Sequence, residues 1–148
     1  MVALQLLGAS VLIVGYLLKT GKISAFSVAY WLYVHTPLGM WLHNRELSKS
    51  RKAGPHSRIT AAALQTRAYA VELVPMLEDN YCYLIIDSTT SEVAAVDPAD
   101  AEAVLARVEE LRGNYGSGLR LTTILTTHCH HDHAGGNQEV GNTLAPCA

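Results

Sequence analysis

The sequence has few cysteines, few charges, no internal repeat and no glycine-rich phosphate-binding loop. Its cysteines, Cys82, Cys129 and Cys147, are odd in number and widely spaced, which excludes a disulfide framework. Charged residues make up 16% of the chain, against about 25% in an average soluble domain, while hydrophobic residues make up 49%. This composition excludes a long disordered chain, because such chains are rich in charge and poor in apolar residues. The 148 residues suffice for one domain of ordinary size.

The charges that are present are unevenly placed, although the net charge is only -2. Residues 1–52 carry six Lys/Arg and one acid, a net charge of +5, whereas residues 53–148 carry five basic and twelve acidic residues, a net charge of -7. A basic front and an acidic back predict two parts with different surroundings. The acidic back contains no recognised nucleic-acid-binding module, so no nucleic-acid partner is expected.

Residues 2–18 contain no charged side chain, and as a helix they would be about 25 Å long. This length is near the lower limit for crossing a hydrocarbon core about 30 Å thick. We expect a membrane anchor here, with a cleaved secretory signal or a buried soluble helix as alternatives. The absence of Arg before Arg45 excludes an Arg-rich mitochondrial presequence. Because the basic residues of the front all follow the apolar run, we expect a membrane-associated protein whose catalytic part is cytosolic.

A second apolar stretch, residues 23–42, is rich in aromatic side chains and is interrupted by His35 and Pro37. It is expected to pair with the first segment, to lie at the membrane interface with Trp and Tyr at the headgroups, or to pack on another protein. The polar, basic residues that follow, up to residue 67, are typical of a linker. The expected organisation is a membrane segment at 1–43, a basic linker at 44–68 and a domain of catalytic type at 69–148.

The back of the chain carries strand and helix signals in alternation. The predicted elements are strands at 69–76, 81–87 and 92–96, a helix at 101–112 and a strand at 119–127. Asp97 to Asp100 supply helix-start signals, and Gly113 is expected to end the helix. A strand–helix–strand unit preceded by short hairpins predicts an α/β layer.

A cluster of polar side chains follows the last predicted strand. Its members are His128, His130, His131, Asp132 and His133. Because alternate residues of an extended chain project to the same side, His128 and His130 should point together, while Cys129 and His131 should pack or support them. Imidazoles and a carboxylate suit zinc, non-haem iron or manganese, and α/β proteins place sites beyond the carboxyl ends of strands. The residues alone leave open a loose metal-binding tract or a solvated loop.

This segment resembles a known family. Residues 127–133 read THCHHDH, which resembles the T-H-x-H-x-D-H signature of metallo-β-lactamase-fold hydrolases, and the continuation AGGN resembles the glyoxalase II branch. The upstream segments VPMLEDNYCYLIID and EVAAVDP occur in the order of that branch, so the resemblance covers residues 71–137. It implies an α/β (α+β) fold, the N-terminal part of a metallo-β-lactamase αββα sandwich, here preceded by a membrane-anchoring helical segment.

The resemblance also implies roles for individual residues. The expected ligands of two divalent metals (zinc, iron or manganese) are His128 and His130 for the first, and Asp132 and His133 for the second. Asp132 would also be a catalytic residue, whereas Asp97 and Thr127 would support the ligands. The metals would activate water for attack on the thioester of an acylated glutathione such as S-lactoylglutathione, releasing glutathione and a hydroxy acid.

The sequence departs from the family after Asn137. The family's further histidine, bridging aspartate and last histidine come from well downstream, whereas QEVGNTLAPCA contains Gly141, Asn142 and Pro146, which would break the family's helix. We therefore expect an incomplete metal site and an inactive or partial form of the hydrolase. The alternatives are a persulfide dioxygenase-like enzyme with a single iron, and a non-catalytic membrane-tethered interaction or regulatory form.

Overall fold

The structure is a computed structural model that describes residues 14–56 and 64–144. The chain divides into two compact units, Met1–Gly39 and Met40–Ala148. Most of the expected anchor, residues 2–18, lies outside the described residues. No helix within the described ranges is both long enough and apolar enough to cross a membrane.

The described part of the first unit is helical. Residues 14–19 form helical turns, and helix α2 (Ala25–His35) begins where Ser24 accepts a hydrogen bond from the backbone N–H of Ser27 at 2.9 Å. None of the residues of α2 is buried. The helix ends at His35, and the next begins at Pro37, so the predicted interruption of the apolar stretch is confirmed.

A polar linker was expected from residue 44, but helix α3 (Pro37–Ala53) includes residues 44–53. The polar composition of this segment indicated a linker. His43, Leu47 and Arg51 nevertheless follow at intervals of four residues, so the three side chains lie on one face of the helix. His43 is buried, Leu47 packs against the core and Arg51 binds Asp100. Their contacts explain why this segment is an ordered helix. The expected domain boundaries stay a prediction.

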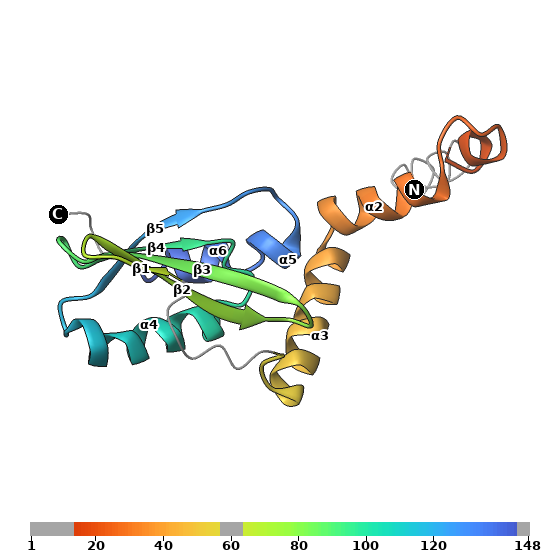
Figure 1. The fold of residues 1–148 in the computed structure, drawn as a ribbon. Helices are drawn as coiled ribbons and strands as arrows, with labels where there is room; N and C mark the ends of the chain where they lie inside the picture. The colour runs from red at the N-terminus through yellow and green to blue at the C-terminus, as the bar shows by residue number, and fades with distance from the viewer. Residues whose placement is uncertain (1–13, 57–63, 145–148) are drawn as a thin grey trace. The chain divides into compact units, whose positions relative to one another are not determined.

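One five-stranded sheet forms the centre of the second unit (Figure 1). Its strands are β1 (Leu64–Gln65), β2 (Tyr69–Met76), β3 (Asn80–Asp87), β4 (Glu92–Val96) and β5 (Arg120–Leu125). They lie in chain order; β1 to β4 pair antiparallel, and β5 pairs parallel to β4. The predicted bounds of β2 and β4 are confirmed, β3 begins one residue earlier than predicted, and β1 was not predicted.

Helix α4 (Ala101–Tyr115) connects the two parallel strands. The carboxylate of Asp100 accepts a hydrogen bond from the backbone N–H of Ala103, which confirms the predicted helix start. The predicted end at Gly113 is wrong: the helix continues to Tyr115 and is closed by Gly116. Gly116 has φ +95°, a conformation that glycine adopts without steric cost, and its N–H bonds to the carbonyl of Arg112.

The core lies between the sheet and helices α4 and α6 (Asn137–Gly141). Alternate residues of β2, β3 and β4 are buried, as a strand with one covered face requires. They pack with residues of both helices, including Val104, Leu111 and Val140. The α/β prediction is therefore confirmed, and the other face of the sheet is partly exposed, with Tyr83 at 43% and Ile85 at 37%.

Candidate metal site

The candidate site lies where the parallel strands β4 and β5 end. Asp97 follows β4 directly, and its backbone N–H bonds to the carbonyl of Leu125, the last residue of β5. The chain then turns through residues 126–130 into the short helix α5 (His131–Ala134). The β5 strand was predicted to reach Thr127 but ends at Leu125, because Thr127 bonds to Asp97 instead.

Asp97 is the centre of a hydrogen-bond network that includes Thr127, His128 and His133. Its Oδ1 accepts the backbone N–H of Thr127 at 2.7 Å, and its Oδ2 accepts the Thr127 hydroxyl at 2.7 Å and Nδ1 of His133 at 3.0 Å. Asp97 adopts φ +53°, a left-handed conformation that aspartate tolerates better than most residues. Burial alone would raise the pKa of Asp97, but the hydrogen bonds from Thr127 and His133 outweigh it and lower that pKa.

This network sets the protonation of two imidazoles. Since an ionised carboxylate only accepts, Nδ1 of His133 must carry the proton that it shares with Asp97. The Thr127 hydroxyl donates to Asp97 and lies 2.9 Å from Nδ1 of His128, so that nitrogen must also donate. In the neutral tautomers, Nε2 of both rings is left as the lone-pair nitrogen that a metal requires.

The three predicted histidine ligands lie close together. The ring centroid of His128 is 4.6 Å from that of His130 and 4.1 Å from that of His133. Nε2 of His133 is 3.4 Å from Oδ2 of Asp132, and two ligands of a tetrahedral zinc ion at about 2.1 Å are themselves about 3.4 Å apart. The donor types, and the spacing of the His133 and Asp132 donor atoms, therefore fit a metal ion. In residues 14–56 and 64–144, however, no group of three or more His, Cys, Asp or Glu side chains is arranged to hold one.

Asn80, the first residue of β3, supports the loop. Its side-chain amide donates to the backbone carbonyl of Asp132 at 2.8 Å, and its backbone carbonyl accepts from Nε2 of His56 at 2.9 Å. The sequence did not identify this contact of Asn80 with the loop. Its position within the family-like segment LEDNY was the available signal.

His43 supports the same loop from helix α3. The ring is 4% exposed, and its Nε2 lies 3.0 Å from the carbonyl of Ala99. Burial lowers the pKa of His43 below 6.5, so the ring is neutral and donates to this carbonyl. A Cβ built on Gly135 would lie 2.3 Å from Nε2 of His43, so glycine is required where the loop passes the ring. The sequence identified neither residue as part of the site.

The structure thus brings together the predicted ligands and their predicted supports. His128, His130 and His133 cluster, and Asp97 and Thr127 hold two of them by hydrogen bonds. Cys129 is exposed. Which of these side chains bind metal, and the catalytic role of Asp132, stay predictions.

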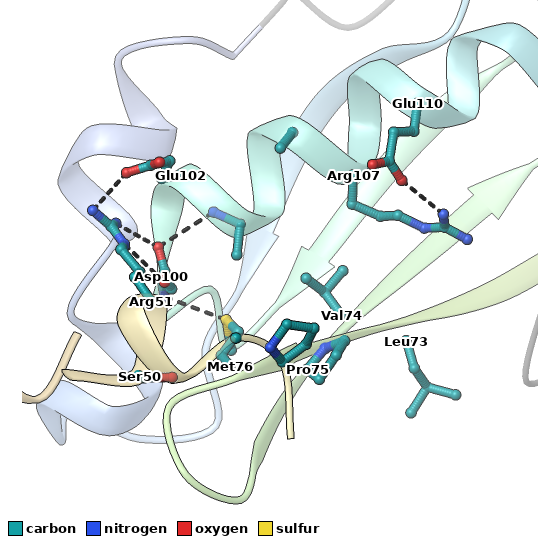
Figure 2. Close-up of a pocket in the computed structure, with 14 residues that line it drawn as sticks. Ser50, Arg51, Leu73, Val74, Pro75, Met76, Asp100, Glu102, Arg107 and Glu110 are labelled. Carbon is teal, nitrogen blue, oxygen red and sulfur yellow. Dashed lines mark hydrogen bonds and ion pairs between the residues drawn. The ribbon is translucent and has the colours of Figure 1, made fainter. Parts of the chain in front are cut away.

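A separate hollow of about 560 Å³ lies between the end of α3, β2 and α4 (Figure 2). Val74, Pro75 and Met76 of β2 form its apolar part. Its lining, as far as the described residues show, includes none of the histidine cluster. The hollow is therefore distinct from the candidate metal site.

Ion pairs lie at both ends of this hollow. Arg51 bonds to Asp100 at 2.6 Å and to Glu102 at 2.5 Å, and the bond to Asp100 raises the pKa of Arg51. At the other end Arg107 bonds to the buried Glu72 at 2.8 Å and to the exposed Glu110 at 2.9 Å. The first group of charges joins α3 to the start of α4 (Figure 2), and the second joins α4 to β2 through Glu72.

The sequence matches the Metallo-beta-lactamase superfamily over residues 63–147, which is more than half of the chain. Members of this superfamily usually bind divalent metals, typically zinc. The matched region contains the described sheet, helix α4 and the histidine loop. Since the match covers the elements that build the candidate site as well as the site itself, the chain belongs to the Metallo-beta-lactamase superfamily.

Proposed function

We propose that the histidine loop belongs to a metal-dependent thioester hydrolase of glyoxalase II type, with an acylated glutathione such as S-lactoylglutathione as substrate. One observation carries the proposal: the Asp97 network leaves Nε2 of His128 and of His133 as lone-pair donors. The carboxylate of Asp132 lies 3.4 Å from the second of these nitrogens. The glyoxalase-like sequence VPMLEDNYCYLIID and the AGGN continuation support the choice of substrate class.

The chain's own residues would hold two divalent cations, zinc first and iron or manganese as alternatives. His128 and His130 would bind one, and Asp132 and His133 the other. When bound, such a metal supplies Lewis acidity, which polarises a carbonyl and lowers the pKa of water to about 7. Asp97 keeps the proton on Nδ1 of His133, and Asn80 holds the backbone of Asp132. These contacts orient the donors before a metal arrives.

We expect the 148-residue chain to bind metal but to hydrolyse S-lactoylglutathione no faster than the background reaction. The reason is that the described donors form a ligand pair and an imidazole cluster rather than a site with three or more arranged ligands. Titration with Co²⁺, followed by its visible absorption, should reveal binding that His128→Ala and Asp132→Asn weaken. His35→Ala, which changes a histidine of α2, is the control.

Co²⁺ binding and S-lactoylglutathione turnover together distinguish the possible outcomes. An absence of Co²⁺ binding, or binding that His128→Ala leaves unchanged, would overturn the proposed metal site. Turnover that His128→Ala abolishes would show that the expected inactivity is wrong. A single bound iron per chain, with oxygen consumption on a persulfide substrate, would favour the dioxygenase alternative.

We also propose that residues 2–42 associate with a membrane and leave the domain in the cytosol. The exposed side chains of Phe26 and Trp31 on α2 support this, because exposed aromatics suit a membrane interface. The stretch YWLYVHTPLGMWLHNREL resembles the membrane-associated long form of the paroxysmal nonkinesigenic dyskinesia protein, a glyoxalase II relative. Flotation of the full chain with phosphatidylcholine–phosphatidylserine vesicles tests the proposal. The chain should float, and a chain that stays at the bottom of the gradient would exclude it.

A further inference from the structure

Helix α3 carries a row of cations on one face. Arg45, Lys49 and Lys52 follow one another at intervals of four and three residues, so they share a face of the helix, and all three are exposed. Trp41 begins the same row and is 57% exposed. The guanidinium carbon of Arg45 lies 5.8 Å from the centre of the Trp41 ring, within the range of a cation–π contact. We call these four residues the basic stripe.

The basic stripe lies on the side of α3 that faces away from the domain. Arg45 and Lys52, two and nine residues after His43, are both about half a turn around the helix from it. His43 is buried, and Leu47 packs against the core. The same helix therefore holds the domain with one face and presents cations with the other.

The charges of the basic stripe are not neutralised by ion pairs within residues 14–56 and 64–144. Arg51, on the packed side of α3, is paired with Asp100 and Glu102. Glu46, the only acid of α3, is half-buried and lies about 100° around the helix from Arg45. Like charges one turn apart repel one another, so an anionic surface would stabilise the stripe.

We propose that the basic stripe binds the anionic headgroups of a phospholipid bilayer, with Trp41 at the level of the headgroups. The proposal rests on the membrane association proposed for residues 2–42, and it adds the class of lipid and the face of the domain that meets it. Lys and Arg beside a membrane attract anionic lipids, and Trp is enriched at the interface. The stripe also begins where the apolar stretch at residues 23–42 ends. A nucleic acid offers similar phosphates, but the adjoining apolar stretch favours a bilayer.

The distribution of charge orients the domain on such a surface. Residues 53–148 carry a net charge of -7, so an anionic bilayer attracts the basic stripe and repels the rest of the domain. His43, on the opposite face of α3, contacts the loop that carries the histidines. The width of α3, roughly 10 Å, would therefore separate this loop from the headgroups.

Quenching of a fluorescent label on the full chain tests the contact. Ser48→Cys, exposed beside the stripe, carries the label in a Cys129→Ser/Cys147→Ser background, in which the remaining Cys82 is buried. The vesicles are phosphatidylcholine, with or without phosphatidylserine, and carry a nitroxide on a headgroup. Phosphatidylserine should produce the quenching, and about 1 M salt, with a Debye length of about 3 Å, should remove it. The same label on Thr89→Cys, in the exposed turn after β3, should not be quenched.

Charge variants identify the residues that make the contact. The triple variant Arg45→Gln/Lys49→Gln/Lys52→Gln should lose the quenching, since each cation near an anionic surface strengthens the attraction about fivefold. Lys49→Arg/Lys52→Arg retains the charges and should retain the quenching. Lys49→Gln should raise the phosphatidylserine content needed for half-maximal quenching, whereas Arg67→Gln, an exposed cation outside the stripe, should not. Circular dichroism should confirm that the variants are folded.

Three results would overturn the proposal. Equal quenching with and without phosphatidylserine would show that apolar association alone makes the contact. Equal effects of Lys49→Gln and Arg67→Gln would show that the stripe has no special role. Displacement of the chain from phosphatidylserine vesicles by a duplex oligonucleotide at equal phosphate concentration would show a preference for nucleic acid.

Flotation with pure phosphatidylcholine vesicles separates this proposal from the one on which it rests. A chain that floats with them, but whose label phosphatidylserine does not quench, would retain the membrane association and reject the basic stripe. Quenching by phosphatidylserine without flotation on phosphatidylcholine would support the stripe and reject the apolar association. Neither measurement depends on metal or turnover, so the result is also separate from that for the proposed hydrolase.

Discussion

The imidazole of His43 occupies the space that a side chain at Gly135 would need. Nε2 of His43 would lie 2.3 Å from a Cβ on Gly135, well inside the closest approach that such atoms make. The same nitrogen is already engaged with the carbonyl of Ala99 at 3.0 Å. Helix α3 and the loop that carries the histidines are therefore fitted to each other at this point.

Replacing Gly135 by alanine should destabilise the protein by about 1–3 kcal/mol, the usual cost of an extra methyl group in a packed site. His43 cannot move away without losing its bond to Ala99. Thermal or urea denaturation measures the effect. Gly118→Ala is the control, because a Cβ there meets no atom within 4 Å. Equal stability of the two variants would contradict the close fit.

The buried His43 should make stability depend on pH. Its folded-state pKa is lowered from 6.5, first by burial and then by the nearby His131, which outweigh the raising effects of the bond to the Ala99 carbonyl and of the charges of Asp100 and Asp132. Below about pH 6.5 the unfolded chain takes up a proton that the folded chain excludes, so stability falls as the pH falls. This contribution is fully present above pH 6.5.

Urea denaturation between pH 5 and 8 can isolate this contribution. His43→Gln keeps a donor for the Ala99 carbonyl but does not titrate, so its stability should fall less than that of the wild type towards low pH. Parallel curves for the two proteins would show that His43 does not cause the loss. His35→Gln controls for a histidine change outside the core.

Asp97→Asn should weaken metal binding about 10–100-fold, as the loss of a carboxylate behind a ligating histidine usually does. The asparagine amide can donate to Nδ1 of His133, which moves the ring proton to Nε2 and blocks the ligand position. Competition titration with Zn²⁺ and a chromophoric chelator measures the affinity. The exposed Asp79→Asn should have no effect. An unchanged affinity in Asp97→Asn would show that the network does not prepare the site.

The ion pairs of Arg107 with Glu72 and with Glu110 should contribute differently to the free energy of unfolding. Glu72 is 5% exposed, and Arg107→Met removes its cation and leaves only the hydrogen bond with Tyr115 to a buried carboxylate, which should cost about 3 kcal/mol. Glu110, the other partner, is exposed, and Glu110→Gln should cost less than about 1 kcal/mol.

The double variant Glu72→Gln/Arg107→Met distinguishes charge from packing. It should recover part of the stability that Arg107→Met loses, because no buried carboxylate without a cation remains. Urea denaturation of the single and double variants gives the comparison. A double variant less stable than both single ones would indicate that Arg107 contributes mainly through packing.

Sequence patterns predicted the strands best where one face of the strand is buried. The bounds of Tyr69–Met76 and Glu92–Val96 were predicted to the residue, because apolar alternation reflects a covered and an uncovered face. The end of α4 was misplaced, since Gly113 and Gly116 are equally plausible by composition and only the backbone conformation distinguishes them. The two-residue strand β1 is too short to leave a pattern.

The sequence likewise predicted only part of the candidate site. The histidines and Thr127 lie in one recognisable motif, and Asp97 directly follows β4. The sequence could therefore identify the histidines and also Asp97 and Thr127, the two residues that set the histidine tautomers. Asn80 and His43 reach the loop from 52 residues away and from another helix, and no local pattern encodes such a contact. Because the residues after His43 are polar, their composition did not indicate that α3 packs on the domain. Three contacts spaced along one face are enough to order this helix.

The order of the strands has a consequence for biosynthesis. Because β1 to β5 lie in the sheet in the order in which they are translated, each strand that leaves the ribosome finds its partner already present. The first hairpins need only short loops, and α4 alone separates the last pair. Pairings between neighbours in sequence form fast, since little loop entropy is lost. The sheet can therefore assemble during translation before the histidine loop, which follows β5, is made.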